Sequence, residues 1–159
     1  MNPVQVRDYV IRPALQRIGL WSLAAEQLVF GTGWVETGYN WLDQTTPGPG
    51  PAYGPWQMEE RTHDDIWLNY LSGQTDLADA LVRMAGFGVV TKPPVIALHG
   101  NLFYGAAMCR VYYKRLKAPL PAAGDAPNMA AYWKNYYNTP AGAGTLDRAI
   151  PLFRQAVAS

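Results

Sequence analysis

Glu36 is the residue whose type and surroundings most clearly predict chemistry. It closes a helical pattern that begins near Ser22, and Trp34, Tyr39 and Trp41 lie close to it in the sequence. The C-terminal end of a helix disfavours negative charge, and aromatic side chains exclude water from a carboxylate. Because both effects raise the pKa of a carboxyl group, we expect Glu36 to stay protonated near neutral pH. Such a group can act as the general acid in glycosidic bond cleavage. The alternative is an ordinary surface glutamate at a helix end.

A second carboxylate would decide which nucleophile completes such a reaction. An inverting glycosidase holds a water molecule between two carboxyl groups that lie ~6.5 to 9.5 Å apart. Glu59 is the first candidate for this second group, and Asp43, in the intervening loop, is another. Glu59 and Glu60 also come directly before a helix expected from Thr62, where acidic side chains interact favourably with the helix dipole. Both interpretations of Glu59 stay open.

The other potentially reactive residues favour structural roles. His63, Asp64 and Asp65 fall in one helical turn and should point in different directions, and His99 lies far along the chain in an apolar segment. This spacing does not match a metal-binding motif, so we expect neither a metal nor a cofactor. Cys109 lies in the apolar run AAMCRVYY, which predicts a core residue.

Helical patterns dominate the chain, and capping residues mark where most of the helices should begin. The residues expected at these starts are Asn2, Ser22, Thr62, Thr75, Asp125 and Thr145. Pro13 should kink or split the first helix, and Gly86 should end the helix that begins at Thr75. The apolar stretch over 95–116 predicts a central helix.

The region around Glu36 contains unusual backbone signals. Gly31 and Gly33 lie inside the second expected helix, where each costs roughly 1 kcal/mol relative to Ala. We therefore expect another backbone to pack closely against them. Residues 38–61 have no helical period and many Gly and Pro residues, which predicts a long irregular loop or a small hairpin. Together the patterns predict a single mainly α domain, 1–159, with about seven helices.

Composition narrows the possible functions. The chain has 159 residues, of which 49% are apolar and 16% charged, so it can bury a core and is not a disordered protein. A net charge of +1 provides no broad field for binding nucleic acid or an anionic membrane. A single cysteine cannot form an internal disulfide. Aromatic residues make up 13% of the chain, and Trp and Tyr are suited to stacking on sugar rings as well as to core packing.

Four short segments resemble the lysozyme-like superfamily, in particular goose-type lysozymes and soluble lytic transglycosylases. VETGY is similar to the Glu-Ser-Gly motif that ends a helix in that family, with Thr37 in place of Ser. GPWQ is similar to the Gly-Leu-Met-Gln motif that follows, with Pro55 and Trp56 as departures. QMEERTH resembles the goose-type run that ends in His, which aligns Glu59 with the acidic position of that run.

Two later segments complete the resemblance. GNLFYGAAMCRVYY is similar to a family helix that begins with Asn, and YYNTPAGAG is similar to a Tyr-Asn-Ala-Gly turn, with Thr139 as a departure. The resemblance implies that Glu36 is the general acid and that the Tyr of the turn, Tyr137, hydrogen-bonds to it. It also implies a set of substrate-binding residues, some of which could equally be core residues: Gln57, Tyr53, Trp56, Tyr39, Tyr137 and Asn101.

The resemblance implies a lysozyme-like fold and an enzyme that acts on bacterial peptidoglycan. Glu36 would protonate the oxygen of the β-1,4 bond between N-acetylmuramic acid and N-acetylglucosamine, as in a muramidase or a lytic transglycosylase. Glu59 would activate water in the first case and have no catalytic role in the second. The alternatives are a non-catalytic component of a phage particle with the same fold, and a glycosidase acting on chitin-like chains.

The ends of the chain suggest how such an enzyme would reach its substrate. Arg7 and Asp8 interrupt the N-terminal apolar pattern, so we expect no signal peptide, and no segment is apolar for long enough to cross a membrane. A protein of this kind would be made in the cytoplasm of a bacterial host. It would then reach the cell wall as a phage endolysin released with a holin, or as part of a virion alongside other virion proteins.

Overall fold

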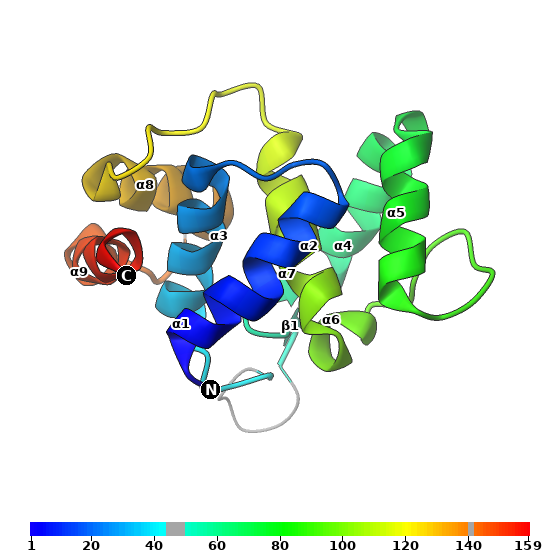
Figure 1. Cartoon of the computed structure of the whole chain (residues 1–159), viewed down its shortest axis with the longest axis horizontal. Helices are drawn as coiled ribbons and strands as arrows, with labels where there is room; N and C mark the ends of the chain where they lie inside the picture. The colour runs from blue at the N-terminus through cyan, green and yellow to red at the C-terminus, as the bar shows by residue number, and fades with distance from the viewer. Residues whose placement is uncertain (44–49, 140–141) are drawn as a thin grey trace.

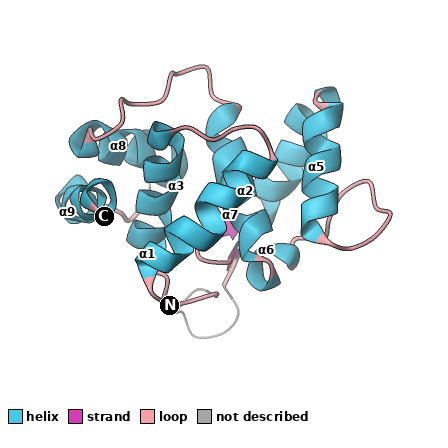
Figure 2. Cartoon of the chain, in the orientation of Figure 1, coloured by secondary structure: helices cyan, strands magenta, loops and turns pink. Residues whose placement is uncertain are grey.

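The computed structural model describes residues 1–43, 50–139 and 142–159, and helices make up most of these residues (Figures 1 and 2). The prediction of a mainly α protein is confirmed. Some helical segments of the described residues are not α-helical, and they continue or join the α-helices. They are the π-helical segments η1 (Arg7–Ile11), η2 (Ile66–Tyr70) and η4 (Trp133–Asn138), and the 3-10 turn η3 (Leu71–Gly73). The α-helices are α1 (Pro3–Val6), α2 (Arg12–Arg17), α3 (Leu23–Glu36), α4 (Glu60–Asp65), α5 (Thr75–Ala85), α6 (Ala97–Gly100), α7 (Leu102–Lys114), α8 (Ala126–Tyr132) and α9 (Leu146–Ala158).

The N-terminal helices follow their sequence signals. The Asn2 side chain accepts hydrogen bonds from the N–H groups of Val4 and Gln5, as expected of a cap. Pro13 lies at the start of α2, and the π-helical segment η1 comes directly before it. Because proline lacks an N–H group, the regular α-helical hydrogen-bond ladder cannot continue through it. Pro13, expected to kink or split the first helix, is preceded by a change from α-helical to π-helical hydrogen bonding, and the helical backbone continues through it without a break.

Helix α3 begins at its expected cap and packs against α9. The Ser22 hydroxyl accepts a hydrogen bond from the Ala25 N–H at 3.1 Å. The expected reason for its two glycines was wrong: the elements that approach them are aromatic rings, not another backbone. A Cβ atom at Gly31 would overlap the ring of Phe153, and one at Gly33 would overlap the ring of Tyr39. The glycines let a phenyl ring of α9 and a tyrosine ring lie directly on α3.

A short hairpin follows α3. For this segment the sequence predicted either a long irregular loop or a small hairpin. Strands β1 (Ala52–Tyr53) and β2 (Met58–Glu59) pair antiparallel, with Ala52 opposite Glu59. The turn between them is anchored to α3 because the Trp56 indole donates a hydrogen bond to the Val29 carbonyl at 3.0 Å. Part of the loop that precedes the hairpin, residues 44–49, lies outside the described residues.

Three expected helix starts differ from the structure. Helix α4 begins at Glu60 rather than being capped by Thr62, with Glu59 at the cap position and no side-chain capping bond. Helix α5 includes Thr75 as its first residue, and Gly86, in a left-handed conformation, ends it as predicted. The expected helix over 95–116 is divided into α6 and α7, because Asn101 is extended and caps α7 through its side chain.

Two apolar clusters form the core, and α7 contributes to both. The first lies among α3, α7, α8 and α9 and includes Phe30, Cys109 and Phe153. The second lies among η2, α5, α6 and α7 and includes Ile66 and Leu81. In Figure 1, α8 and α9 accordingly lie on one side of the molecule and α5 on the other. Cys109 is fully buried, as predicted.

The described helices give no sign of a transmembrane segment. None of them combines the length and the apolar character that spanning a bilayer would require.

Candidate functional site

Glu36 lies in the middle of three neighbouring pockets. We call them the Glu36 pocket, of about 330 Å³, the Glu59 pocket, of about 360 Å³, and the Trp34 pocket, of about 520 Å³. Gln57 and Asn138 line both the Glu36 pocket and the Glu59 pocket. Glu36 itself lines both the Glu36 pocket and the Trp34 pocket. Neighbouring pockets share lining residues and therefore adjoin one another, and we call the set of three the groove.

Segments distant in the sequence build the Glu36 pocket. Its lining residues come from the end of α3, the loop after it, the hairpin turn, η4 and the start of α9. The described lining residues are Val35, Glu36, Thr37, Trp41, Asp43, Gln57, Trp133, Asn138, Ala143, Gly144 and Arg148. Carboxyl, amide, indole and guanidinium groups therefore converge on one concavity.

Glu36 is the last residue of α3 and is partly buried. The Trp133 indole N–H donates a hydrogen bond to Glu36 Oε1 at 2.8 Å. Burial raises the pKa of Glu36 from its ordinary value of 4.5 to about 7, although the Trp133 hydrogen bond and the Arg148 charge each lower it. Removal from water thus outweighs two interactions that favour the carboxylate. The expected protonation near neutral pH is supported, with burial as its largest cause.

Gln57 is held in a strained backbone conformation beside this acid. Its φ is 48°, in the left-handed region, and its side-chain amide donates to the Gly54 carbonyl at 2.8 Å. Thr139, which lines the Glu59 pocket together with Gln57, also has a positive φ of 65°. Non-glycine residues in this region cost of order 1–3 kcal/mol each and concentrate at functional sites. The predicted placement of Gln57 in the cleft is consistent with its position between the two pockets.

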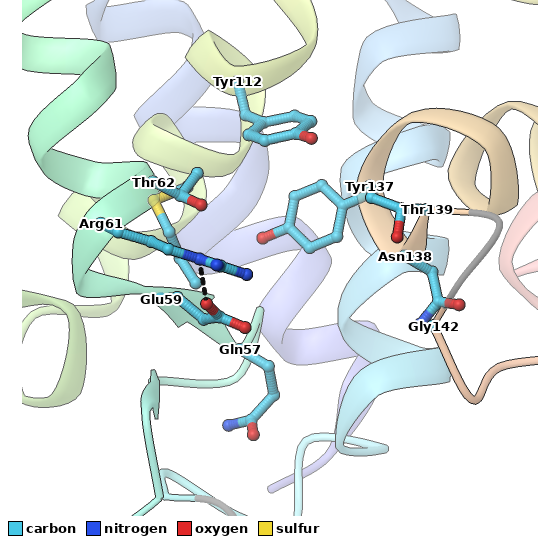
Figure 3. Close-up of a pocket in the computed structure, with 10 residues that line it drawn as sticks. Gln57, Glu59, Arg61, Thr62, Tyr112, Tyr137, Asn138, Thr139 and Gly142 are labelled. Atoms are coloured by element: carbon cyan, nitrogen blue, oxygen red, sulfur yellow. Dashed lines mark ion pairs between the residues drawn. The ribbon is translucent and has the colours of Figure 1, made fainter.

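Glu59 lies in the neighbouring pocket rather than in that of Glu36. Its carboxylate pairs with Arg61 Nε at 2.6 Å. Figure 3 shows this pair on one side of the Glu59 pocket, with Tyr137 and Asn138 on the other side. Asp43, by contrast, lines the Glu36 pocket directly. Of the two candidates for a second carboxylate, Asp43 is therefore the one that shares a pocket with the acid.

The hydrogen bond expected between Tyr137 and Glu36 is replaced by another. The Tyr137 hydroxyl donates to the Trp56 carbonyl at 2.7 Å, and Trp133 takes the position next to the acid. Both residues belong to η4, and their side chains bond to different partners, the carboxylate at the end of α3 and a carbonyl of the hairpin turn. Tyr137 still lines the groove, in the Glu59 pocket.

Three of the expected substrate-binding residues are structural instead. Trp56 and Tyr39 are only 2% and 1% exposed, so neither offers a ring to a ligand. Tyr39 donates from its hydroxyl to the Phe30 carbonyl at 2.8 Å. The Asn101 side chain caps α7 and donates to the Met84 carbonyl at 2.8 Å. A motif position predicts a residue's place in the chain, but burial decides whether that residue can touch a ligand.

Tyr53 has an intermediate position. It is partly buried in β1, and its ring lies 4.7 Å from the ring of His99, centroid to centroid. It does not line any of the three pockets as described.

The groove also contains aromatic and polar residues that were not among the predicted binding residues. Trp41, which is 56% exposed, lines two pockets and is available for stacking. Trp133, Asn138 and Arg148 are further examples. The abundance of aromatic residues is a signal that could have pointed to Trp41 and Trp133. Nothing in the local sequence distinguishes Arg148, because the folding of α9 onto α3 brings it to the groove.

The histidine region has its own network. His63 Nε2 and the Tyr104 hydroxyl share a hydrogen bond of 2.8 Å, and Asp64 pairs with Lys92 at 2.6 Å. Burial lowers the pKa of His63, so the neutral imidazole is favoured. Within the described ranges, no three His, Cys, Asp or Glu side chains form a group that could hold a metal ion.

Comparison of the chain with known protein families, with curated proteins and with solved structures finds no match. Its fold and site define a mainly helical protein with a partly buried glutamic acid at two adjoining pockets.

Proposed function

We propose that the protein is a glycosidase on a lysozyme-like fold that cleaves the β-1,4 bond between N-acetylmuramic acid and N-acetylglucosamine in peptidoglycan. The observation that carries this proposal is Glu36, a glutamic acid with a pKa of about 7 that lines two adjoining pockets. A general acid for this reaction must be protonated at working pH and must face the leaving oxygen. Glu36 meets the first requirement, and the groove provides access for the second.

The shape and chemistry of the groove support a chain-like substrate. Pockets extend on both sides of Glu36, so sugar units can bind on either side of a scissile bond. The lining offers amide groups from Gln57 and Asn138 for sugar hydroxyls and acetamido groups, and Trp41 provides an exposed aromatic face. Aromatic faces with nearby hydrogen-bonding groups are suited to carbohydrate rings.

The sequence resemblance supports the same substrate. The motif VETGY contains Glu36, GPWQ contains Gln57, and the turn YYNTPAGAG contains Asn138; these three residues line the Glu36 pocket. Segments separated by up to about one hundred residues in the chain therefore meet at one site, as the resemblance implies for a lysozyme-like protein.

The nucleophile distinguishes two versions of the reaction. In a muramidase, water attacks, and Asp43 is the carboxylate that shares the pocket with the acid, whereas Glu59 is paired with Arg61 in the next pocket. In a lytic transglycosylase, the sugar's own 6-hydroxyl attacks and no second carboxylate is needed. The products distinguish the two, because water leaves a reducing end and the 6-hydroxyl leaves an anhydro end.

The proposal is tested by incubating purified peptidoglycan sacculi with the wild type and with Glu36→Gln, and by identifying the released fragments by mass. We expect release by the wild type and a loss of at least about 100-fold in the variant, since general acid catalysis contributes 10²–10⁴-fold. Reducing ends would make Asp43→Asn the next variant, with Glu59→Gln as its comparison. If the wild type releases nothing, or Glu36→Gln releases as much, the proposal fails and a non-catalytic role in a phage particle replaces it.

A further inference from the structure

Arg148 is a cation of the groove for which the described part of the chain supplies no hydrogen-bond or ion-pair partner. It lies in the first turn of α9, and its side chain lines both the Glu36 pocket and the Trp34 pocket. Among the described residues, no hydrogen bond or ion pair is made by its guanidinium. A cation in the first turn of a helix is also disfavoured by the helix dipole, so helix stability does not explain its position.

The other cations beside the groove already have partners. Arg61 pairs with Glu59 at 2.6 Å. Lys134 donates to the Asn138 side chain and to two backbone carbonyls, at 2.8–2.9 Å. Arg148 differs from both because its donors are exposed to whatever occupies the groove. Five N–H donors in a planar fork are suited to binding a carboxylate through two hydrogen bonds.

The charge of Arg148 acts at the site of the proposed chemistry. It is close enough to Glu36 to lower the pKa of that carboxyl group, and the two residues line the same two pockets. The backbone N–H of Arg148 is hydrogen-bonded to the capping Thr145 hydroxyl at 3.4 Å, which ties the residue to the start of α9. An anionic group bound by Arg148 would thus lie within one sugar unit's reach of the acid.

Building on the proposed function, we infer that Arg148 binds a carboxylate of the substrate and so selects carboxylate-bearing glycans over neutral ones. In peptidoglycan, that carboxylate belongs either to the lactyl group of N-acetylmuramic acid, where no peptide is attached, or to the peptide stem. A chain of N-acetylglucosamine alone has neither. Arg148 is a specificity-determining residue in this proposal, distinct from the acid.

Binding by an inactive protein provides the direct test. Glu36→Gln and Glu36→Gln/Arg148→Gln are titrated with three soluble ligands: peptide-free peptidoglycan chains, chains with peptide stems, and a chitooligosaccharide of equal length. We expect the Arg148 change to weaken binding of a carboxylate-bearing chain by about 10-fold or more, since hydrogen bonds to charged groups contribute ≈ 1.5–3 kcal/mol. Binding of the neutral chain should change by less than about twofold. Loss with peptide-free chains identifies the lactyl group, and loss only with stem-bearing chains identifies the peptide.

Two matched variants serve as controls. Arg154→Gln removes the same charge from an exposed position of the same helix outside the three pockets, and should leave all three affinities unchanged. Arg148→Lys keeps the charge but not the planar fork, and should retain part of the preference for carboxylates. An equal loss for charged and neutral chains, or an equal effect of Arg154→Gln, would overturn the assignment.

A second readout uses the cleavage reaction. Because the Arg148 charge lowers the pKa of Glu36, Arg148→Gln should shift the alkaline limb of the pH–activity profile to higher pH. Asp43 lines the same pocket and Asp147 precedes Arg148 in α9, and both remain in the variant, so the shift reports the lost guanidinium. If the wild type neither binds nor cleaves any glycan, the proposed function itself fails. If it cleaves but Arg148→Gln leaves the carboxylate preference intact, only this inference is overturned.

Discussion

At the scale of single residues, Glu36 shows how a site can keep a destabilising group. Burial disfavours its charged form, and neither the Trp133 hydrogen bond nor the Arg148 charge offsets this effect fully. The difference between 4.5 and about 7 corresponds to about 3 kcal/mol at alkaline pH, at 1.36 kcal/mol for each pKa unit. An uncharged residue at this position would avoid that loss of stability. Glu36 therefore imposes a stability cost that a function in the groove explains.

The first prediction concerns the pH dependence of stability. Glu36 binds its proton more tightly in the folded chain than in the unfolded chain. Its contribution to the free energy of unfolding is therefore fully present below about pH 4.5 and is lost as the pH rises toward about 7. Glu36→Gln removes this titration and keeps an oxygen that can accept from Trp133. We expect the variant to be more stable than the wild type at pH 8, by up to about 3 kcal/mol.

Urea unfolding at pH 4.5 and at pH 8 measures this difference. The gain for Glu36→Gln should nearly vanish at the lower pH, where the wild-type carboxyl group is protonated. Asp76→Asn, a change at an exposed residue of α5, controls for the general effect of removing a carboxylate. A gain for Glu36→Gln that is the same at both pH values would show that ionisation is not its cause.

At the scale of elements, α3 positions the acid by being buried along most of its length. Its glycines admit rings from Tyr39 and from Phe153 of α9. These contacts bring the start of α9, and with it Arg148, to the end of α3 where Glu36 lies. The π-helical segment η4 likewise directs Trp133 to the acid and Tyr137 to the hairpin. Departures from ideal helices thus determine which side chains reach the groove.

The second prediction tests the ring that packs on α3. Gly31→Ala should lower the free energy of unfolding by about 1–3 kcal/mol, because the added methyl group overlaps the Phe153 ring. The direction of the change in stability is informative, because Ala stabilises a helix by roughly 1 kcal/mol relative to Gly where no clash occurs. Gly73→Ala, at a position with open space, should be neutral or stabilising. Thermal or urea unfolding of the two variants compares them directly.

A double variant makes this prediction more specific. Phe153→Leu reduces the volume that meets Gly31, so the cost of Gly31→Ala should be smaller in a Phe153→Leu background than in the wild type. Additive effects of the two changes would mean that the ring is not what the new methyl group encounters.

At the scale of the whole molecule, the groove depends on how the parts of the chain meet. The hairpin is tied to α3 by Trp56 and to η4 by Tyr137, through bonds that join residues 27 and 81 positions apart. The Glu59 pocket therefore forms between α4 and η4, and the Trp34 pocket between α3 and α9. The acid lines the Trp34 pocket and the Glu36 pocket, and the Glu36 pocket adjoins the Glu59 pocket through Gln57 and Asn138.

The third prediction follows from this central position. If the enzyme cleaves glycans as proposed, the rate should rise with chain length until pockets on both sides of Glu36 are filled, and a disaccharide should be a poor substrate. Binding energy from sugars remote from the bond lowers the barrier to cleavage. Rates on a size-graded series of peptidoglycan glycans, with product masses, measure this effect. Preferential release of single terminal units would contradict the binding of sugar units on both sides of Glu36.

The sequence by itself determined part of the local structure and singled out Glu36 as the candidate acid. Local signals were predictable because each acts within a few residues of the chain. They include the helix caps at Asn2 and Ser22, the change of helix type before Pro13 and the helix end at Gly86. The raised pKa of Glu36 was predictable in direction, because helix position and aromatic neighbours can be read locally. The hairpin was one of two structures that the Gly- and Pro-rich segment allowed.

Only the tertiary structure decided what surrounds that acid. Tyr39 and Trp56 have the residue types of a sugar-binding surface, but their rings fill the core instead. Trp133 rather than Tyr137 contacts Glu36, because the Tyr137 hydroxyl bonds to the Trp56 carbonyl of the hairpin turn, 81 positions away in the chain. Arg148 reaches the groove only because α9 packs on α3. Burial and long-range contacts depend on how the whole chain packs, so no pattern of neighbouring residues determines them.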